Sequence, residues 1–182
     1  MDYVKNFSEH TMIREAIRNS RILVLRSLTK FFAMPGLRLG YRIGTKTVLK
    51  KIRSYQPPWA VNSLAQASGA EILKDKHFME KSRSYMLRER LKLYRQLCKI
   101  DGIIPYPPEA NFIFCKIRTI TSAELCRLCA MEGILIRDCS NFRGLDNHFI
   151  RVAVRQREEN RKMVNTLRRI IHNSGKGSSL RR

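Results

Sequence analysis

One lysine in the first third of the chain has neighbours typical of a residue that reacts with an aldehyde. Lys30 follows the aliphatic run 22–25 and the hydroxyl residue Ser27, and Arg38 comes eight positions later between two glycines. A lysine held in a partly apolar pocket loses part of its preference for the charged state and becomes nucleophilic. Ser27 and Arg38 can hold a phosphate through a hydroxyl donor and a charged fork. The pattern indicates pyridoxal 5'-phosphate, a cofactor with both an aldehyde and a phosphate.

Each of these residues also has a simpler interpretation. A lysine at a strand end is usually a surface residue, and an arginine in a strand is usually structural. The spacing of Ser27, Lys30 and Arg38 favours cofactor chemistry, as do Gly36 and Gly40, because glycine lets a backbone approach a ligand closely.

Two further arginines stand at apolar, strand-like runs. Arg137 follows residues 133–136, and Arg151 lies within the run 149–154. An unpaired buried charge is costly, so each arginine is expected to face an anion. Arg155, four positions after Arg151, is interpreted as structural. The carboxylates that could pair with the first two arginines, in place of a ligand, are Asp138, Asp146 and Glu158.

The motif Ser-x-x-Lys followed by Gly-x-Arg-x-Gly-Tyr resembles the lysine region of fold-type I aminotransferases. Three later segments extend the resemblance in order, at residues 57–65, 134–146 and 149–155, so that it covers about residues 20–171. They resemble the branch that holds histidinol-phosphate aminotransferases and threonine-phosphate decarboxylases. The segment Cys-x-Asn-Phe-x-Gly-Leu-Asp within 139–146 favours the decarboxylases.

The resemblance implies a role for each candidate residue. Lys30 would be the catalytic lysine, and Ser27, Lys30 and Arg38 would bind pyridoxal 5'-phosphate. Arg137 and Arg151 would bind the carboxylate or phosphate of a small phosphorylated amino acid. The implied reaction is decarboxylation of L-threonine O-3-phosphate to (R)-1-amino-2-propanol O-2-phosphate in cobalamin biosynthesis, by an enzyme that is usually a homodimer.

Two alternatives to this reaction remain open. One is a transaminase similar to histidinol-phosphate aminotransferase, because the arginines alone do not distinguish the reactions. The other follows from length: enzymes of this family are about twice as long, and the chain resembles only their C-terminal half. Under this alternative the chain is a non-catalytic fragment, or a subunit that requires a separate N-terminal half.

Composition limits the other classes of function. The 182 residues are 43% hydrophobic and 28% charged, as in globular proteins. Neither a membrane span nor a signal peptide is predicted, and five cysteines without a secreted spacing indicate reduced thiols in a cytoplasmic protein. Cys126 and Cys129 fit a packed helix face better than a metal site. The net charge of +21 is spread over the chain, so neither a nucleic-acid nor a membrane partner is expected.

The periodicity predicts an α/β fold, the C-terminal part of the fold-type I architecture. Residues 1–60 would complete the large cofactor domain, 61–101 would form a linking helical segment, 102–173 a small α+β domain and 174–182 a disordered tail. The predicted strands are 22–25, 37–43, 103–104, 112–117, 134–137 and 149–154. The predicted helices are 8–18, 45–55, 62–100 with a break near 74–76, 121–131 and 158–171.

Overall fold

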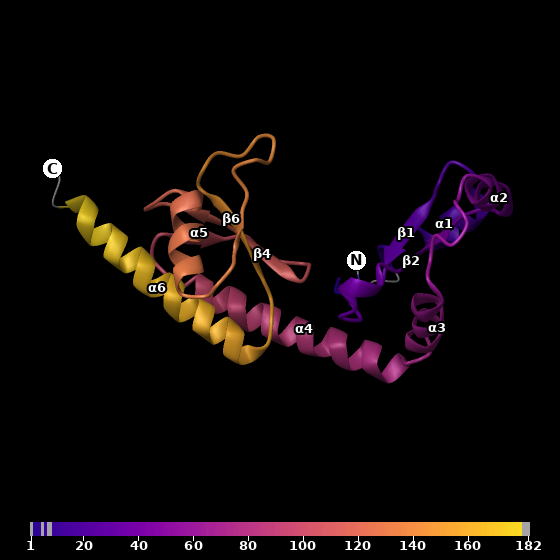
Figure 1. The fold of residues 1–182 in the computed structure, drawn as a ribbon. Coiled ribbons are helices and arrows are strands. Elements are labelled where there is room, and N and C mark those ends of the chain that lie inside the picture. The colour runs from indigo at the N-terminus through magenta and orange to yellow at the C-terminus, as the bar shows by residue number, and fades with distance from the viewer. Residues whose placement is uncertain (1, 5, 7–8, 180–182) are drawn as a thin grey trace. The chain divides into compact units, whose positions relative to one another are not determined.

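The computed structural model describes residues 2–4, 6 and 9–179 of the chain. It has the predicted mixed α/β composition, with helices and two antiparallel sheets (Figure 1). The chain divides into two compact units, Met1–Arg83 and Ser84–Arg182. The division falls inside the segment 61–101, for which a linking helical stretch was predicted.

The first unit is built around a two-stranded hairpin. Strand β1 (Val24–Ser27) pairs antiparallel with β2 (Gly40–Ile43). The prediction of a buried strand at 22–25 was wrong, because β1 begins two residues later and Leu25 is 73% exposed. The strand predicted for 37–43 begins only at Gly40, because the preceding Pro35–Leu37 forms a 3-10 turn.

Helices follow the hairpin and begin at side-chain caps. In α2 (Lys46–Ser54) Thr45, the first residue of the predicted helix 45–55, is the cap, and its hydroxyl accepts a hydrogen bond from the Val48 amide. In α3 (Ser63–Ile72) the Asn62 side chain accepts a hydrogen bond from the Ala65 amide in the same way.

A helix also precedes the hairpin. The described part of the predicted helix 8–18 is shorter and consists of α1 (Ile13–Arg18).

The break predicted near 74–76 is confirmed. Helix α3 ends at Ile72 and α4 (Lys76–Leu97) begins four residues later. The carboxylate of Asp75 accepts a hydrogen bond from the Phe78 amide at 2.8 Å, which satisfies a free donor of the first turn of α4.

The second unit is a four-stranded antiparallel sheet covered by helices on one face. Its strand order is β3 (Ile103–Pro105), β4 (Phe112–Ile117), β6 (Phe149–Ala153) and β5 (Arg137–Asp138). Residues alternate between buried and open along β4 and β6. The buried face packs on α4, α5 (Ser122–Met131) and α6 (Arg157–Ser179), through a core that includes Leu93, Leu125 and Leu167.

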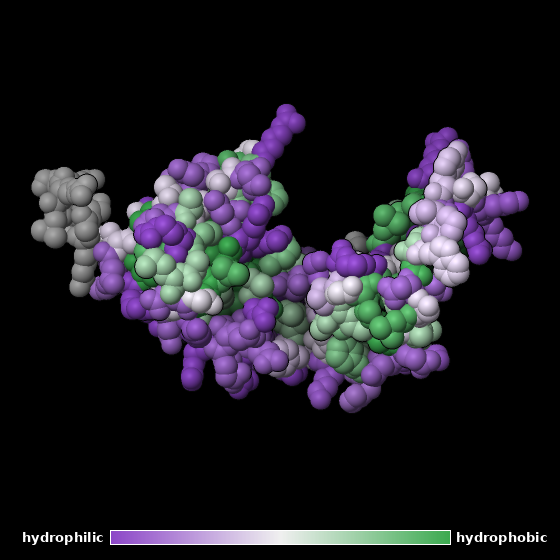
Figure 2. Space-filling view, viewed as in Figure 1, coloured by the Kyte–Doolittle hydropathy of each residue, from purple (hydrophilic) through white to green (hydrophobic). Residues whose placement is uncertain are grey.

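The helices of this unit are amphipathic, as their periodicity predicts. Leu125 and Cys129 of α5 are fully buried, and Thr121 caps this helix by accepting a hydrogen bond from the Glu124 amide. Hydrophilic side chains follow the outward faces of α4 and α6 (Figure 2). Helix α6 continues to Ser179, across most of the segment for which a disordered tail was predicted. The Ser174 hydroxyl bonds the Ile170 carbonyl within this extension, and residues 180–182 lie outside the described residues.

Candidate functional site

The hairpin of the first unit brings the predicted cofactor residues to one loop. Ser27 is opposite Gly40 in the strand register, and the Leu28 amide donates to the Leu39 carbonyl at 3.0 Å. Ser27 ends β1 and Arg38 precedes β2, so the two residues lie at the same end of the hairpin. Lys30 lies in the loop between them.

The loop holds the backbone of Lys30 in place and leaves its amine free. Leu28, Thr29 and Phe31 around it are buried. The Met34 amide bonds the Thr29 carbonyl, and the Ala33 amide bonds the carbonyl of Lys30. Lys30 itself is exposed, so the expectation of a partly apolar pocket around it was wrong for the described residues. Its amine makes no hydrogen bond or ion pair with any of them.

Two hydroxyl residues, Ser27 and Thr29, precede the lysine in sequence and contact each other. The Ser27 Oγ and Thr29 Oγ1 atoms are 2.8 Å apart, and the Thr29 amide donates to Ser27 Oγ at 3.4 Å. One hydroxyl donates to the other, so the pair retains one proton for an outside acceptor. The sequence reasoning left Thr29 out of the site, although a hydroxyl residue directly before the lysine was a usable signal.

Arg38 has a backbone conformation that a non-glycine residue rarely adopts. Its φ is 51°, in the left-handed region. Holding a non-glycine residue in this conformation costs about 1–3 kcal/mol, and such residues cluster at functional sites. Its Nη1 atom donates to the Pro35 carbonyl at 3.0 Å. The other N–H groups of its guanidinium have no partner among the described residues, so they remain available to an anion.

Of the two glycines near Arg38, Gly40 has a close backbone neighbour and Gly36 has none. A Cβ atom on Gly40 would lie 2.6 Å from the Arg26 carbonyl oxygen, so this glycine permits the close approach of β1 and β2. A Cβ on Gly36 would meet nothing within 4 Å. The close approach that glycine allows here is between two strands, which fixes the loop ends that carry Ser27 and Arg38.

Together, the loop offers a primary amine, a hydroxyl pair and a guanidinium. An amine can react with an aldehyde, while hydroxyl and guanidinium donors bind a phosphate. The donor set therefore fits a ligand that carries both groups.

In the second unit, two of the predicted arginines lie directly opposite each other. Arg137 of β5 is the register partner of Arg151 of β6. Because Arg151 alternates with the buried Ile150 and Val152, both arginines lie on the sheet face that the helices leave open. Like charges in directly opposite positions destabilise a sheet. An anion bound by both guanidinium groups would offset this repulsion.

The expectation that a buried strand delivers Arg137 was wrong, whereas Arg151 lies in β6 between the buried Ile150 and Val152, within the strand predicted for 149–154. Both arginines are exposed, and only Arg137–Asp138 of the predicted strand 134–137 lies in a strand. Leu135 is 89% exposed. Exposure removes the argument that the charges must be paired for reasons of burial, and leaves the repulsion between them as the physical reason for a bound anion.

Aromatic rings support the two guanidinium groups. The Cζ atom of Arg151 lies 4.7 Å from the ring centroid of Phe112, and that of Arg137 lies 5.7 Å from the ring of Phe142. Arg137 also donates to the Asn141 amide oxygen at 3.1 Å. Such contacts restrict the positions of both charges. The sequence reasoning missed these rings, although aromatic residues at alternate positions of β4 were a signal for this face.

The carboxylates considered as alternative partners do not pair with the arginines. Asp138 accepts hydrogen bonds from the Ser140 amide at 2.9 Å and from the Ser122 hydroxyl at 2.8 Å. These bonds, the amide above all, lower the pKa of Asp138. Asp146 lies near Lys116 and His148. Within the described part of the chain, neither Arg137 nor Arg151 forms an ion pair.

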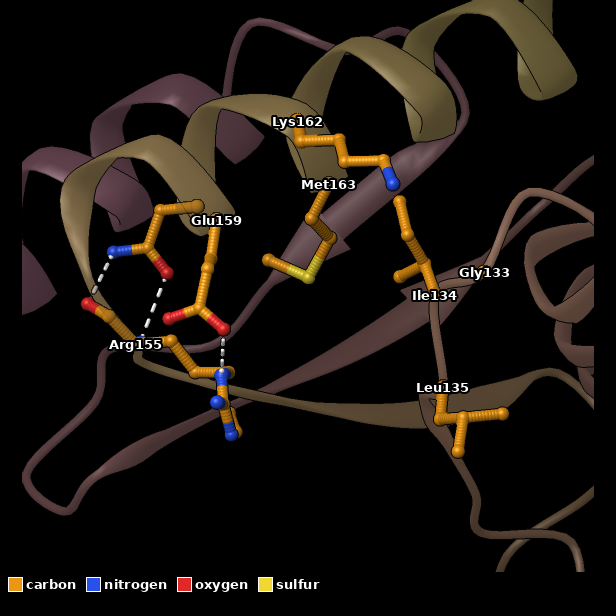
Figure 3. A pocket seen from close by; sticks show the side chains of 9 residues that line it. Gly133, Ile134, Leu135, Arg155, Glu159, Lys162 and Met163 are labelled. Carbon is orange, nitrogen blue, oxygen red and sulfur yellow. Dashed lines mark hydrogen bonds and ion pairs between the residues drawn. The ribbon is translucent and has the colours of Figure 1, made fainter.

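Arg155 lies in a separate cavity, with a volume of about 360 Å³, between α6 and residues 133–135 (Figure 3). Its Nε atom pairs with Glu159 at 2.7 Å. The buried Asn160 side chain accepts from the Arg155 amide and donates to its carbonyl. The charge of Arg155 is thus offset by the carboxylate of Glu159, as expected for a structural residue.

The described cysteines are all free thiols. Cys129 is fully buried in the core, and burial raises the pKa of its thiol to about 12. Burial also raises the pKa of Cys126 to about 11. Groups of three or more side chains suited to a metal ion are absent from the residues that the structure describes. Helices long and apolar enough to cross a membrane are also absent from this part of the chain.

Comparison with known proteins identifies the family. The model of the aminotransferase class I and II family matches residues 3–167. The chain belongs to this family. The predictions of the superfamily and of its fold are confirmed. The histidinol-phosphate aminotransferase of Sinorhizobium meliloti, which has a similar fold, was solved in complex with pyridoxal-5'-phosphate, the predicted cofactor.

Relatives of two activities are similar to the chain. A candidate threonine-phosphate decarboxylase of Caldanaerobacter subterraneus subsp. tengcongensis is 38% identical over 92% of this chain and 46% of its own length. The threonine-phosphate decarboxylase of Salmonella typhimurium is 36% identical over 84% of this chain and 42% of its own. The histidinol-phosphate aminotransferase of Clostridium acetobutylicum is 35% identical in sequence, and its crystal structure matches the fold with a TM-score of 0.86. The match covers 91% of this chain and 50% of that protein. The chain thus spans about half the length of the relatives it matches.

Proposed function

We propose that this chain takes part in the pyridoxal 5'-phosphate-dependent decarboxylation of L-threonine O-3-phosphate to (R)-1-amino-2-propanol O-2-phosphate, a reaction of cobalamin biosynthesis. The observation that carries the proposal is the hairpin loop, where the free amine of Lys30 lies in one short loop with Ser27 and Arg38. The similarity to two relatives named for this decarboxylase supports the choice of reaction.

Different residues of the loop would bind different groups of the cofactor. Lys30 would hold the cofactor at its aldehyde, and its Nζ atom would carry a proton to or from the substrate. Ser27 and Arg38 bind the phosphate, with Thr29 orienting the Ser27 hydroxyl. When bound, pyridoxal phosphate supplies an electron sink for the charge left by bond cleavage at the α-carbon of an amino acid.

Arg137 and Arg151 bind the anionic groups of the substrate. Each charge-assisted hydrogen bond that they make contributes about 1.5–3 kcal/mol. The aromatic rings beneath the guanidinium groups keep them in position before an anion arrives, which lowers the entropy that binding costs. The way in which Arg137 and Arg151 would share the carboxylate and the phosphate would set the orientation of the substrate, and with it the choice between decarboxylation and transamination.

Two other functions have specific support. The likeness to the Clostridium acetobutylicum aminotransferase, at 35% identity, favours a transaminase similar to histidinol-phosphate aminotransferase. The other alternative is a non-catalytic fragment, or a subunit that acts only with a separate N-terminal half; the chain spans about half the length of each relative. For the complete enzyme we propose a homodimer, and for its location the cytoplasm, where the free cysteines stay reduced.

The reaction is tested by product analysis on the 182-residue chain with pyridoxal phosphate. Release of CO₂ from L-threonine O-3-phosphate, lost in Lys30→Ala, is the expected result. Formation of a keto product from histidinol phosphate and 2-oxoglutarate without CO₂ release would instead assign the transaminase. If the chain shows neither reaction but both Ser27 and Lys30 are needed to bind the cofactor, it is a subunit without catalysis of its own.

A further inference from the structure

A long stretch of the first unit carries positive charge without any carboxylate. The sequence contains no aspartate or glutamate between Glu15 and Glu71, while lysine and arginine recur from Arg18 to Arg53. In most proteins acidic and basic residues alternate on the surface, and their fields largely cancel. Cations in this stretch therefore have no acidic neighbours in sequence.

Part of this charge converges on a groove between β2 and α2. The groove has a volume of about 610 Å³, within the range of small-molecule sites. It is formed by the end of the hairpin, one face of the helix and the turn after it, all within one compact unit. The residues that line it are Arg42, Lys46, Leu49, Lys50, Arg53 and Gln56.

The helical spacing places three cations side by side. Lys46, Lys50 and Arg53 are four and three positions apart, so they share one face of α2. Like charges at this spacing repel each other and destabilise a helix. Among the residues that the structure describes, none of the groove's cations forms an ion pair. The repulsion is thus left uncompensated within the protein.

The other polar residues of the groove are positioned by the fold. Arg42 donates from its Nη2 atom to the Gln56 amide oxygen at 2.8 Å. Helix α2 begins with Lys46 and has no acidic residue in its first turn, where the helix dipole favours a negative charge. An anion in the groove would relieve both the side-chain repulsion and this unfavourable helix start.

We propose that this groove binds an oligophosphate, a small anion of two or more linked phosphate groups, separately from the residues assigned to the cofactor. A row of cations along one helix face matches several charges in a line, and a single phosphate can contact only part of it. Among the described residues that line the groove there is no aromatic ring on which a nucleobase could stack. The chemistry of the groove thus recognises the phosphate chain.

The test is a calorimetric titration of the full 182-residue chain with inorganic tripolyphosphate, with orthophosphate as the comparison. The key variant is Lys46→Ala combined with Lys50→Ala. Lys51→Ala is the matched control, because Lys51 belongs to the same helix but does not line the groove. Alanine is the strongest helix former, so these exposed substitutions preserve α2, and circular dichroism verifies this.

We expect tripolyphosphate to bind at least tenfold more tightly than orthophosphate. The double variant should lose at least tenfold in affinity, while Lys51→Ala changes it less than threefold and added salt weakens binding. The Lys30→Ala variant should bind tripolyphosphate unchanged, which separates this site from the cofactor site. Equal losses in the double variant and the control would overturn the proposal, as would equal affinity for the two anions. Binding of long RNA or DNA without binding of tripolyphosphate would also overturn it.

Discussion

Replacing Gly40 by alanine should loosen the hairpin that carries the cofactor loop. The new Cβ atom would lie 2.6 Å from the Arg26 carbonyl oxygen and 3.6 Å from the Ser27 Cα atom. The first distance is far inside van der Waals contact, and a backbone oxygen cannot rotate away as a side chain does. Relief requires β1 and β2 to separate, which weakens the bond between the Leu28 amide and the Leu39 carbonyl.

The size of this effect follows from the cost of overpacking, about 1–3 kcal/mol. Hydrogen exchange measures it locally and does not require the two units to unfold together. Because about 1.4 kcal/mol corresponds to a factor of ten, amides of residues 24–43 should exchange about 5- to 150-fold faster in Gly40→Ala.

Gly36→Ala is the matched control, because its Cβ would meet nothing within 4 Å. It should leave exchange in the hairpin unchanged or slow it slightly, since alanine restricts the unfolded chain. Covalent labelling of Lys30 by pyridoxal phosphate should fall in Gly40→Ala only. If the two variants exchange and label alike, the close approach of the strands does not fix the loop, and this reasoning fails.

Three further predictions concern the second unit and its thiols. Iodoacetamide at pH 8 should alkylate the exposed Cys98 quickly and leave Cys129 unlabelled in the folded chain, as peptide mapping would detect, because burial raises the pKa of Cys129 to about 12. Asp138→Asn should remove part of the acid sensitivity of unfolding, because the Ser140 amide lowers the pKa of Asp138 in the folded chain. The contribution of Asp138 to the free energy of unfolding is complete above the unfolded pKa of about 4, and it is lost as the pH falls through the lower folded value. An unfolding midpoint with the same pH dependence in both proteins would contradict this. Leu167→Ala should cost about 2–5 kcal/mol in urea unfolding, because Leu167 is fully buried in the core; a loss below 1 kcal/mol would contradict the described packing.

The sequence predicted best those elements whose pattern is local. Strand β4 was located to the residue, because 112–117 is a short run of apolar and aromatic residues, which favour strands. The cap at Thr45 and the break after α3 were also predictable, since both depend on a few neighbouring residues.

The features that sequence reasoning missed depend on contacts between distant segments. The register that sets Arg137 opposite Arg151 is a property of strand pairing, which spacing along the chain does not show. Apolar neighbours in sequence suggested buried arginines, but Leu135, two residues before Arg137, is itself exposed. The need for Gly40 was attributed to a ligand, whereas it arises from the Arg26 carbonyl on the opposite strand.

The central claim is that Lys30 is the cofactor lysine, and covalent trapping tests it most directly. The full chain is mixed with pyridoxal phosphate, its absorbance is recorded, borohydride is added and the labelled peptides are identified by mass spectrometry. The account predicts that label concentrates on the peptide containing Lys30 and that the absorbance band disappears in Lys30→Ala but not in Lys51→Ala. Label spread evenly over the surface lysines, with a band that Lys30→Ala leaves unchanged, would contradict it.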